Sequence, residues 1–139
     1  MDDPLAAEKY ISLATFRKTG KAVATPIWFA HAGGSYFAFS ANNAGKVKRL
    51  RNSPRSRIAA CDARGRVHGH WIDTETTILT DTPAVQKAHA ALRKKYGFQM
   101  WIGDVLARLT GRIHNRAFLE IQLTPEATAT PKDITINTA

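Results

Sequence analysis

The sequence has little cysteine, few acidic residues and no long apolar run, and each shortage excludes a class of protein. A single cysteine, Cys61, excludes an internal disulfide and a cysteine-based zinc site, as is typical of a protein from a reducing compartment. No stretch approaches the roughly 20 consecutive apolar residues that a membrane-spanning helix needs. Segment 1–10 opens with acids where a secretory signal has a basic end, so we expect a cytoplasmic protein with no membrane partner.

Length and composition predict one domain over residues 1–139. A chain of 139 residues can bury about two thirds of its unfolded surface in a single core. Hydrophobic residues make up 44% of it, which is ordinary for a globular protein. Only the tail over 124–139, rich in Thr, Ala and Pro, has the composition of an extended segment.

The charge is strongly positive and unevenly placed. Twenty basic residues against eleven acidic ones give a net charge of +9. Between Ala44 and Arg66, one acid stands among eight bases: Asp62 among Lys46, Lys48, Arg49, Arg51, Arg55, Arg57, Arg64 and Arg66. Such clustering indicates an anionic partner, which can be a nucleic acid or a small anionic ligand held by one or two of these bases.

The first part of the chain reads as strands. Period-two alternation and glycine turns predict strands over 10–17, 21–30 and 35–40, with turns at 19–20 and 33–34. We expect these three strands to form a consecutive meander. Pro26 lies inside the second strand and cannot donate a ladder hydrogen bond, so it predicts a bulge or an unpaired edge.

The rest of the chain alternates helices with further strands. Helical periodicity and cap residues predict helices over 44–51, 82–96 and 98–109, with Asn43 and Thr82 as N-caps of the first two. Further strands are predicted over 57–62, 67–80 and 116–123. Six strands with too few helices to cover a parallel sheet favour a mainly antiparallel barrel.

Three motifs carry a resemblance to a known family. They are Phe16-Arg17, then Thr25-Pro26-Ile27-Trp28, and then Gly45-Lys46-Val47-Lys48-Arg49-Leu50-Arg51 before Pro54. With them the first half of the chain resembles the pyridoxamine 5'-phosphate oxidase-like superfamily, most of all its branch of F420-dependent enzymes. The second half is similar only in its pattern of elements. The resemblance implies a mainly β fold, a split β-barrel of the FMN-binding type, with about six mostly antiparallel strands.

The same resemblance implies a pocket for a phosphorylated flavin-like cofactor. The residues implied are Thr25, Pro26, Trp28, Ser40, Ala41, Asn42, Lys46, Lys48, Arg49 and Arg51. Lys46 stands in the first turn of a predicted helix, where free N–H groups and the helix dipole favour an anion. The flat ring is expected against the strand that carries Pro26 and Trp28, although Trp28 alone would equally fit an ordinary core residue.

The implied function is transfer of hydride between the deazaflavin coenzyme F420 and a small conjugated substrate. The cofactor supplies the chemistry, so no catalytic side chain is predicted. FMN is the alternative cofactor, and a noncatalytic cofactor-binding or haem-binding protein is a further alternative. F420 is favoured over FMN, because F420 carries a polyglutamate tail whose negative charges Arg49, Arg55 and Arg57 could bind. Binding of nucleic acid is least favoured, because the basic segment lacks interleaved aromatic residues.

Two further features bear on metals and assembly. The run 68–71, His-Gly-His-Trp, puts two histidines on one face of a predicted strand, but without a third ligand we predict no metal site. This run departs from the family motif, which leaves the substrate side of the pocket open. The resemblance also implies a homodimer that closes the cofactor site. Large apolar residues suited to its interface, or else to a cap on the barrel's own core, are Trp71, Phe98, Met100 and Trp101.

Overall fold

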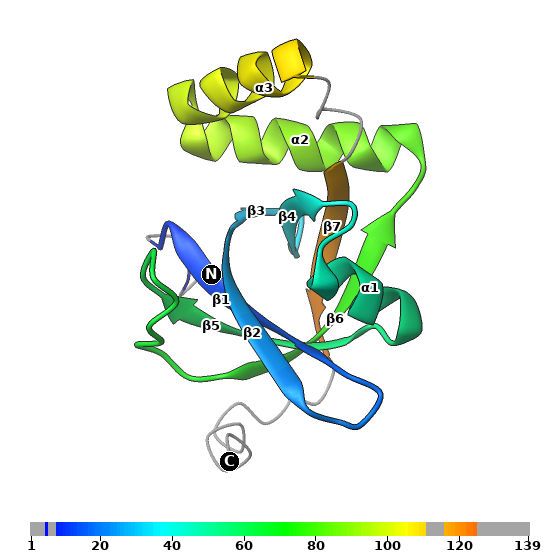
Figure 1. The fold of residues 1–139 in the computed structure, drawn as a ribbon. Helices are drawn as coiled ribbons and strands as arrows, with labels where there is room; N and C mark the ends of the chain where they lie inside the picture. The colour runs from blue at the N-terminus through cyan, green and yellow to red at the C-terminus, as the bar shows by residue number, and fades with distance from the viewer. Residues whose placement is uncertain (1–4, 6–7, 111–115, 125–139) are drawn as a thin grey trace.

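The computed structural model describes residue 5, residues 8–110 and residues 116–124, without the side chain of Phe98 (Figure 1). The predicted extended tail lies outside this part, apart from Thr124. The elements in chain order are β1 Tyr10–Phe16, β2 Ala22–Trp28, β3 Ala30–Ala32, β4 Ser35–Ala41, α1 Gly45–Asn52, β5 Arg55–Cys61, β6 Ile72–Leu79, α2 Thr82–Tyr96, α3 Phe98–Thr110 and β7 Arg116–Leu123. The third helix and the last strand lie within one residue of their predicted bounds.

The strands form one antiparallel sheet in the order β2-β1-β5-β6-β7-β4-β3. The sheet curls into a half-barrel with α2 lying across one end and α3 on the outer side of α2 (Figure 1). This arrangement confirms the predicted mainly β split barrel, with seven strands in place of about six.

The predicted meander is wrong, because the second predicted strand breaks at Phe29. Residues before the break pair with β1 at one edge of the sheet, and residues after it form β3 at the opposite edge. The backbone N–H of Phe29 donates to the hydroxyl of Tyr96 over 2.9 Å. That hydroxyl lies 2.8 Å from the carbonyls of both Phe29 and Lys9, to which it can donate. A side chain 67 residues away therefore takes the hydrogen bonds that a neighbouring strand would otherwise make.

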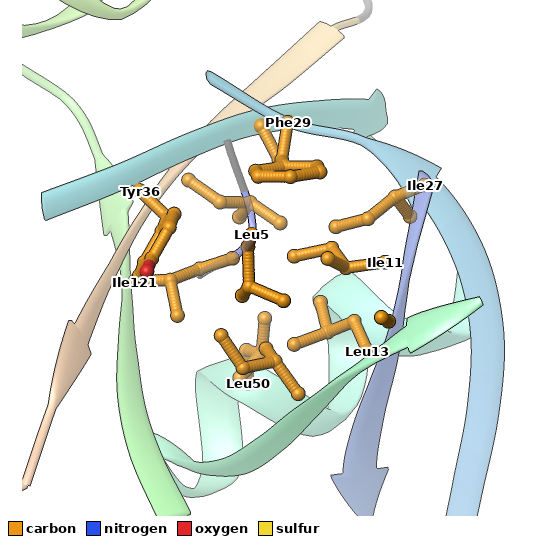
Figure 2. Packing of buried hydrophobic residues seen from close by; sticks show 12 residues of the cluster. Leu5, Ile11, Leu13, Ile27, Phe29, Tyr36, Leu50 and Ile121 are labelled. Carbon is orange, nitrogen blue, oxygen red and sulfur yellow. The ribbon is translucent and has the colours of Figure 1, made fainter. Parts of the chain in front are cut away.

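The inner face of the curled sheet encloses the main core. Strand alternation turns Tyr36 and Ala38 inward, and Phe37 and Phe39 outward toward α2. Figure 2 shows Leu50 of α1 pointing into the same cluster as the strand residues, so the helix closes one end of the barrel. A fully buried leucine contributes about 2 kcal/mol from removal of its apolar surface from water.

A second cluster fixes α2 and α3 on the outer face of the sheet. Ala88, Leu92 and Tyr96 of α2 pack with Phe37 and Met100. Met100 is only 1% exposed, so the prediction that it lies in a subunit interface is wrong, and it belongs to the core. Its position on α3 turns it toward α2 and not toward solvent.

Both predicted N-caps are displaced by one residue. Ala44 caps α1 without a side-chain hydrogen bond, in place of Asn43, because the Ala44 N–H bonds back to the Ala41 carbonyl and moves the helix start along the chain. Asp81 caps α2 in place of Thr82, since its carboxylate accepts the Ala84 N–H at 3.2 Å.

The predicted strand 67–80 is also too long at its start. β6 begins at Ile72, while Val67 makes an isolated bridge to Cys61. A Cβ atom on Gly69 would lie 3.2 Å from the Ala60 side chain, so the backbone crosses closely here and does not continue as a ladder. The two histidines of this run therefore do not share a strand face, and His68 Nε2 lies 2.8 Å from Glu8 Oε1.

The described part of the chain offers neither a cluster of metal ligands nor a membrane-spanning helix. Within residues 8–110 and 116–124, no group of three His, Cys, Asp or Glu side chains is placed to hold a metal ion. No helix in the same part is long and apolar enough to span a bilayer.

Candidate functional site

The predicted site residues fall into two groups in the structure. One group lies on β2, and the other runs from the end of β4 through the turn into α1. β2 contacts β4 across the curled sheet, although the two strands are not hydrogen-bonded neighbours. The curl of the sheet thus brings the edge strand β2 into contact with β4, which lies next to the opposite edge strand β3.

Lys46 is a half-buried cation in the first turn of α1. Its Nζ lies 3.4 Å from the hydroxyl of Ser40, a long hydrogen bond. Burial, and then the positive charge of Arg49, lower the pKa of Lys46. No carboxylate of the described residues forms an ion pair with it. An anion bound here would offset both the burial of the ammonium and its repulsion from Arg49, because it would supply the missing negative charge.

Arg49 folds back toward the start of the same helix. Its Nε donates to the hydroxyl of the buried Thr15 over 2.6 Å. A Cβ atom on Gly45 would lie 2.9 Å from Nη1 of Arg49, so the glycine leaves room for the guanidinium over the helix start. Burial, and then the charge of Arg17, lower the pKa of Arg49. The first and third motifs of the sequence therefore add positive charge to the same end of the barrel.

The other basic residues implied for the site differ in whether they have a local partner. Arg51 Nη2 donates to Asn42 Oδ1 over 2.9 Å, which fastens the turn between β4 and α1. Lys48 is exposed. Of the bases expected to meet a polyglutamate tail, Arg57 is ion-paired with Asp73 at 2.7 Å and Arg55 lies over the Phe16 ring. Arg51 and Arg57 thus have local partners, whereas Lys46 has only a long contact.

The β2 residues do not share one face of the strand. Thr25 lies on the side of the buried Ile27, which faces the barrel interior, and Pro26 and Trp28 alternate with them. The Thr25 hydroxyl is buried without a hydrogen-bond partner among the described residues, and such a group costs about 1–3 kcal/mol. One face of Trp28 is stacked on Tyr96, with ring centroids 4.5 Å apart, so a flat ligand has only its other face.

A cleft that the sequence did not predict lies between α3 and the end of β4. Its volume is about 980 Å³, and Arg116 at the start of β7 lines it. Arg116 Nη1 donates to Asp104 Oδ1 over 2.7 Å, and His89 Nε2 lies 2.9 Å from the other oxygen of that carboxylate. The available signal was Asp104 itself, the only acidic residue of a mainly apolar helix, which suggests an inward-facing partner.

The comparisons with known proteins agree on the fold. The family model described as pyridoxamine 5'-phosphate oxidase matches residues 1–128. No curated protein sequence matches the chain. Among solved structures, HutZ, the haem storage protein from Vibrio cholerae, is 15% identical with a TM-score of 0.66, over 85% of this chain and 83% of HutZ.

Two further solved structures bind different cofactors. An FAD-binding protein from Mesorhizobium loti is 21% identical with a TM-score of 0.57, over 86% of this chain and 82% of its own. A haem-binding protein from Mycobacterium smegmatis is 15% identical with a TM-score of 0.62, over 86% of this chain and 48% of its own. At these identities the likeness concerns the fold alone.

Proposed function

Because the chain belongs to the pyridoxamine 5'-phosphate oxidase family, we propose that it is a single-domain oxidoreductase that holds a phosphorylated flavin-type cofactor at the start of α1. The observation that carries this proposal is Lys46, a half-buried cation beside Arg49 with no carboxylate partner among the described residues. A phosphate at this helix start would meet the ammonium of Lys46, the Ser40 hydroxyl and free backbone N–H groups together.

We propose F420 as the cofactor, with FMN as the alternative. Either one supplies hydride chemistry when bound, while the protein binds and orients it. The unpartnered Thr25 hydroxyl offers the ring a hydrogen bond from β2. Trp28 lies on the other side of this strand and stacks on Tyr96, so a ring bound at Thr25 would not stack on it. Arg49 and Arg55 remain as charges for a polyglutamate tail, because Arg57 is already paired with Asp73.

Parallel titrations with F420, FMN and haem test the cofactor assignment. Each ligand absorbs visible light, so one spectroscopic assay gives three affinities under the same conditions. F420 is expected to bind tightest. Tighter binding of FMN would favour the alternative cofactor, tighter binding of haem would favour a noncatalytic role, and binding of none would refute the proposal.

Lys46→Ala is expected to weaken cofactor binding by about 1.5–3 kcal/mol, or roughly 10- to 150-fold, while the fold remains intact. The physical reason is loss of a charged hydrogen-bond donor to the phosphate. Titration of the folded variant measures the change. Lys94→Ala is the matched control, because Lys94 is an exposed lysine near the end of α2 and its loss should leave affinity unchanged. Unchanged cofactor affinity in Lys46→Ala would show that the cofactor phosphate binds elsewhere.

We also propose a homodimer that forms through the exposed apolar face of α3. That face carries Trp101, Ile102, Val105 and Leu109, and the exposed Leu106 at its border also lines the cleft between α3 and β4. Leu109 is 78% exposed and Trp101 is 51% exposed, which leaves two large apolar side chains in water. Arg108 is the only charged α3 residue besides the buried Asp104, so two copies of a basic chain can meet here with little repulsion.

Leu109→Glu is therefore expected to shift the protein from dimer to monomer, because the new charge would be buried at the interface. Sedimentation equilibrium at micromolar concentration measures the shift. Leu123→Glu, an equivalent change at an exposed leucine of β7, should leave the dimer intact. If the partner's α3 helps to close the cofactor site, Trp101→Ala lowers cofactor affinity together with dimer stability. A wild-type monomer with full cofactor affinity would contradict the proposal.

A further inference from the structure

The cleft between α3 and the end of β4 has the size of a small-molecule site. Its volume of about 980 Å³ lies near the upper end of the usual range, about 300–1,000 Å³. Phe39 and Ala41 of β4 form one wall, and Leu106 and Ala107 of α3 form the other. Phe39 and Ala41 alternate along β4 with Ser40, so the cleft and the proposed phosphate pocket lie on different faces of this strand.

A fixed guanidinium lines this cleft. The Arg116 side chain is only 11% exposed and is held by Asp104, by the Gly103 carbonyl at 3.2 Å and by the Phe39 ring, 4.8 Å from Cζ. A guanidinium has five N–H donors, and these two hydrogen bonds use two of them. Donors therefore remain for a ligand, and the arginine is held in place before the ligand arrives.

The other cleft-lining groups favour an acceptor on the ligand. Asn42 and Asn43 line the cleft, and their side-chain amides can donate to a ligand. The Thr110 hydroxyl donates to the Leu106 carbonyl over 2.9 Å and is therefore not available as a donor. No carboxylate side chain is among the described residues that line the cleft. A negative group at Arg116 would therefore meet the guanidinium donors left free by Asp104 and Gly103, and the nearest like charge would be the Asp104 carboxylate on the Nη1 side. The apolar walls would cover a hydrocarbon or aromatic body.

We propose that this cleft binds a small apolar carboxylate, with the carboxylate on Arg116 and the apolar body against Phe39, Leu106 and Ala107. The cleft shares Ala41 and Asn42 with the residues implied for the cofactor pocket, but its anion-binding group is Arg116 and not Lys46, so the proposal does not depend on the proposed oxidoreductase function. Its test therefore uses the full chain without added cofactor.

Calorimetric titration with 2-naphthoate and with its neutral amide tests the proposal. The acid is expected to bind at least about tenfold more tightly than the amide, because only the acid gains the charge-assisted hydrogen bonds. Equal binding of the two probes, or no binding of either, would refute the carboxylate site.

Gly103→Leu should block the cleft without damage to the fold. A Cβ at Gly103 meets no atom within 4 Å, and leucine is a better helix residue than glycine, so the variant should melt no lower than the parent. Naphthoate affinity is expected to fall at least about tenfold, whereas Gln99→Leu, at an exposed α3 residue outside the cleft lining, leaves it unchanged. Full affinity in a folded Gly103→Leu protein would place the probe elsewhere.

Arg116→Lys tests the role of the guanidinium directly. Lysine keeps the charge but loses the planar fork, so the preference for acid over amide should shrink, with little change in affinity for the amide. A preference that stays at its wild-type value would show that Arg116 does not contact the carboxylate.

Discussion

Asp104→Ala is expected to lower the free energy of unfolding by about 3–5 kcal/mol at neutral pH. Asp104 is buried and receives hydrogen bonds on both oxygens, from Arg116 and from His89. Its loss would leave the Arg116 guanidinium, 11% exposed, without a counter-charge among the described residues. Urea denaturation measures the difference, and the double variant with Arg116→Met should recover part of it because no buried charge then remains unpaired.

Asp73→Ala is the matched control for this prediction. Its ion pair with Arg57 has the same length, 2.7 Å, but the Asp73 side chain is 40% exposed. Partly solvated pairs contribute little, so this variant should lose less than about 1 kcal/mol. Equal losses in the two variants would mean that burial of Asp104 does not determine its contribution.

The effect of Asp104 also has a defined pH dependence. Burial alone would raise the pKa of Asp104, but the hydrogen bond from Arg116 and the interaction with His89 outweigh burial and hold this pKa below its ordinary value. A lowered carboxyl pKa stabilises the fold above the ordinary pKa, and the stabilisation is lost as pH falls through the lowered value. The stability gap between wild type and Asp104→Ala should therefore close in acid.

Tyr96→Phe is expected to cost about 2–4 kcal/mol of unfolding free energy, because two buried backbone groups of Phe29 lose their partner. The ring that stacks on Trp28 is kept, so the change reports on the hydroxyl. Tyr10→Phe is the control, because no hydrogen bond of the Tyr10 hydroxyl is found in the described structure. A loss as small as in the control would show that water replaces the tyrosine at the strand break.

We also expect the Tyr96 hydroxyl to make the fold less stable in alkali. Burial raises the pKa of Tyr96 to about 12, above its ordinary value of 10.0. The stabilisation from a raised pKa is complete below the ordinary value and is lost as pH rises through about 12. Tyrosinate absorbance should show a late-titrating tyrosine in the wild type that is missing from Tyr96→Phe.

The parts of the fold that were predictable from sequence depend on local pattern. β7 was found within its bounds because its apolar alternation is clear, and α2 because Ala88, Leu92 and Tyr96 form one stripe closed by Gly97. The break at Phe29 could not be found this way, since a hydroxyl 67 residues away creates it. On local propensity alone, Phe29 is predicted to be one more residue of a continuous strand.

The candidate site was predictable to a smaller extent. Lys46 follows from its place in a basic helix that starts after a strand, and the structure adds its burial and its single long contact with Ser40. Arg51 carries the same charge in the same motif but is bonded to Asn42, which spacing alone does not reveal. Arg116 was missed because its partner, Asp104, lies on a different element and the cleft exists only after α3 folds over β4.

The two ends of the sheet have a consequence for the behaviour of the protein at high concentration. An incomplete barrel leaves two strand edges, β2 and β3, and such edges can recruit strands from other molecules into aggregates. One edge carries Pro26, which offers no N–H to an incoming strand, and the other is three residues long. Both devices protect against intermolecular strand addition. Pro26, which lies within β2 without breaking its register with β1, therefore makes this edge a poorer template for fibril growth.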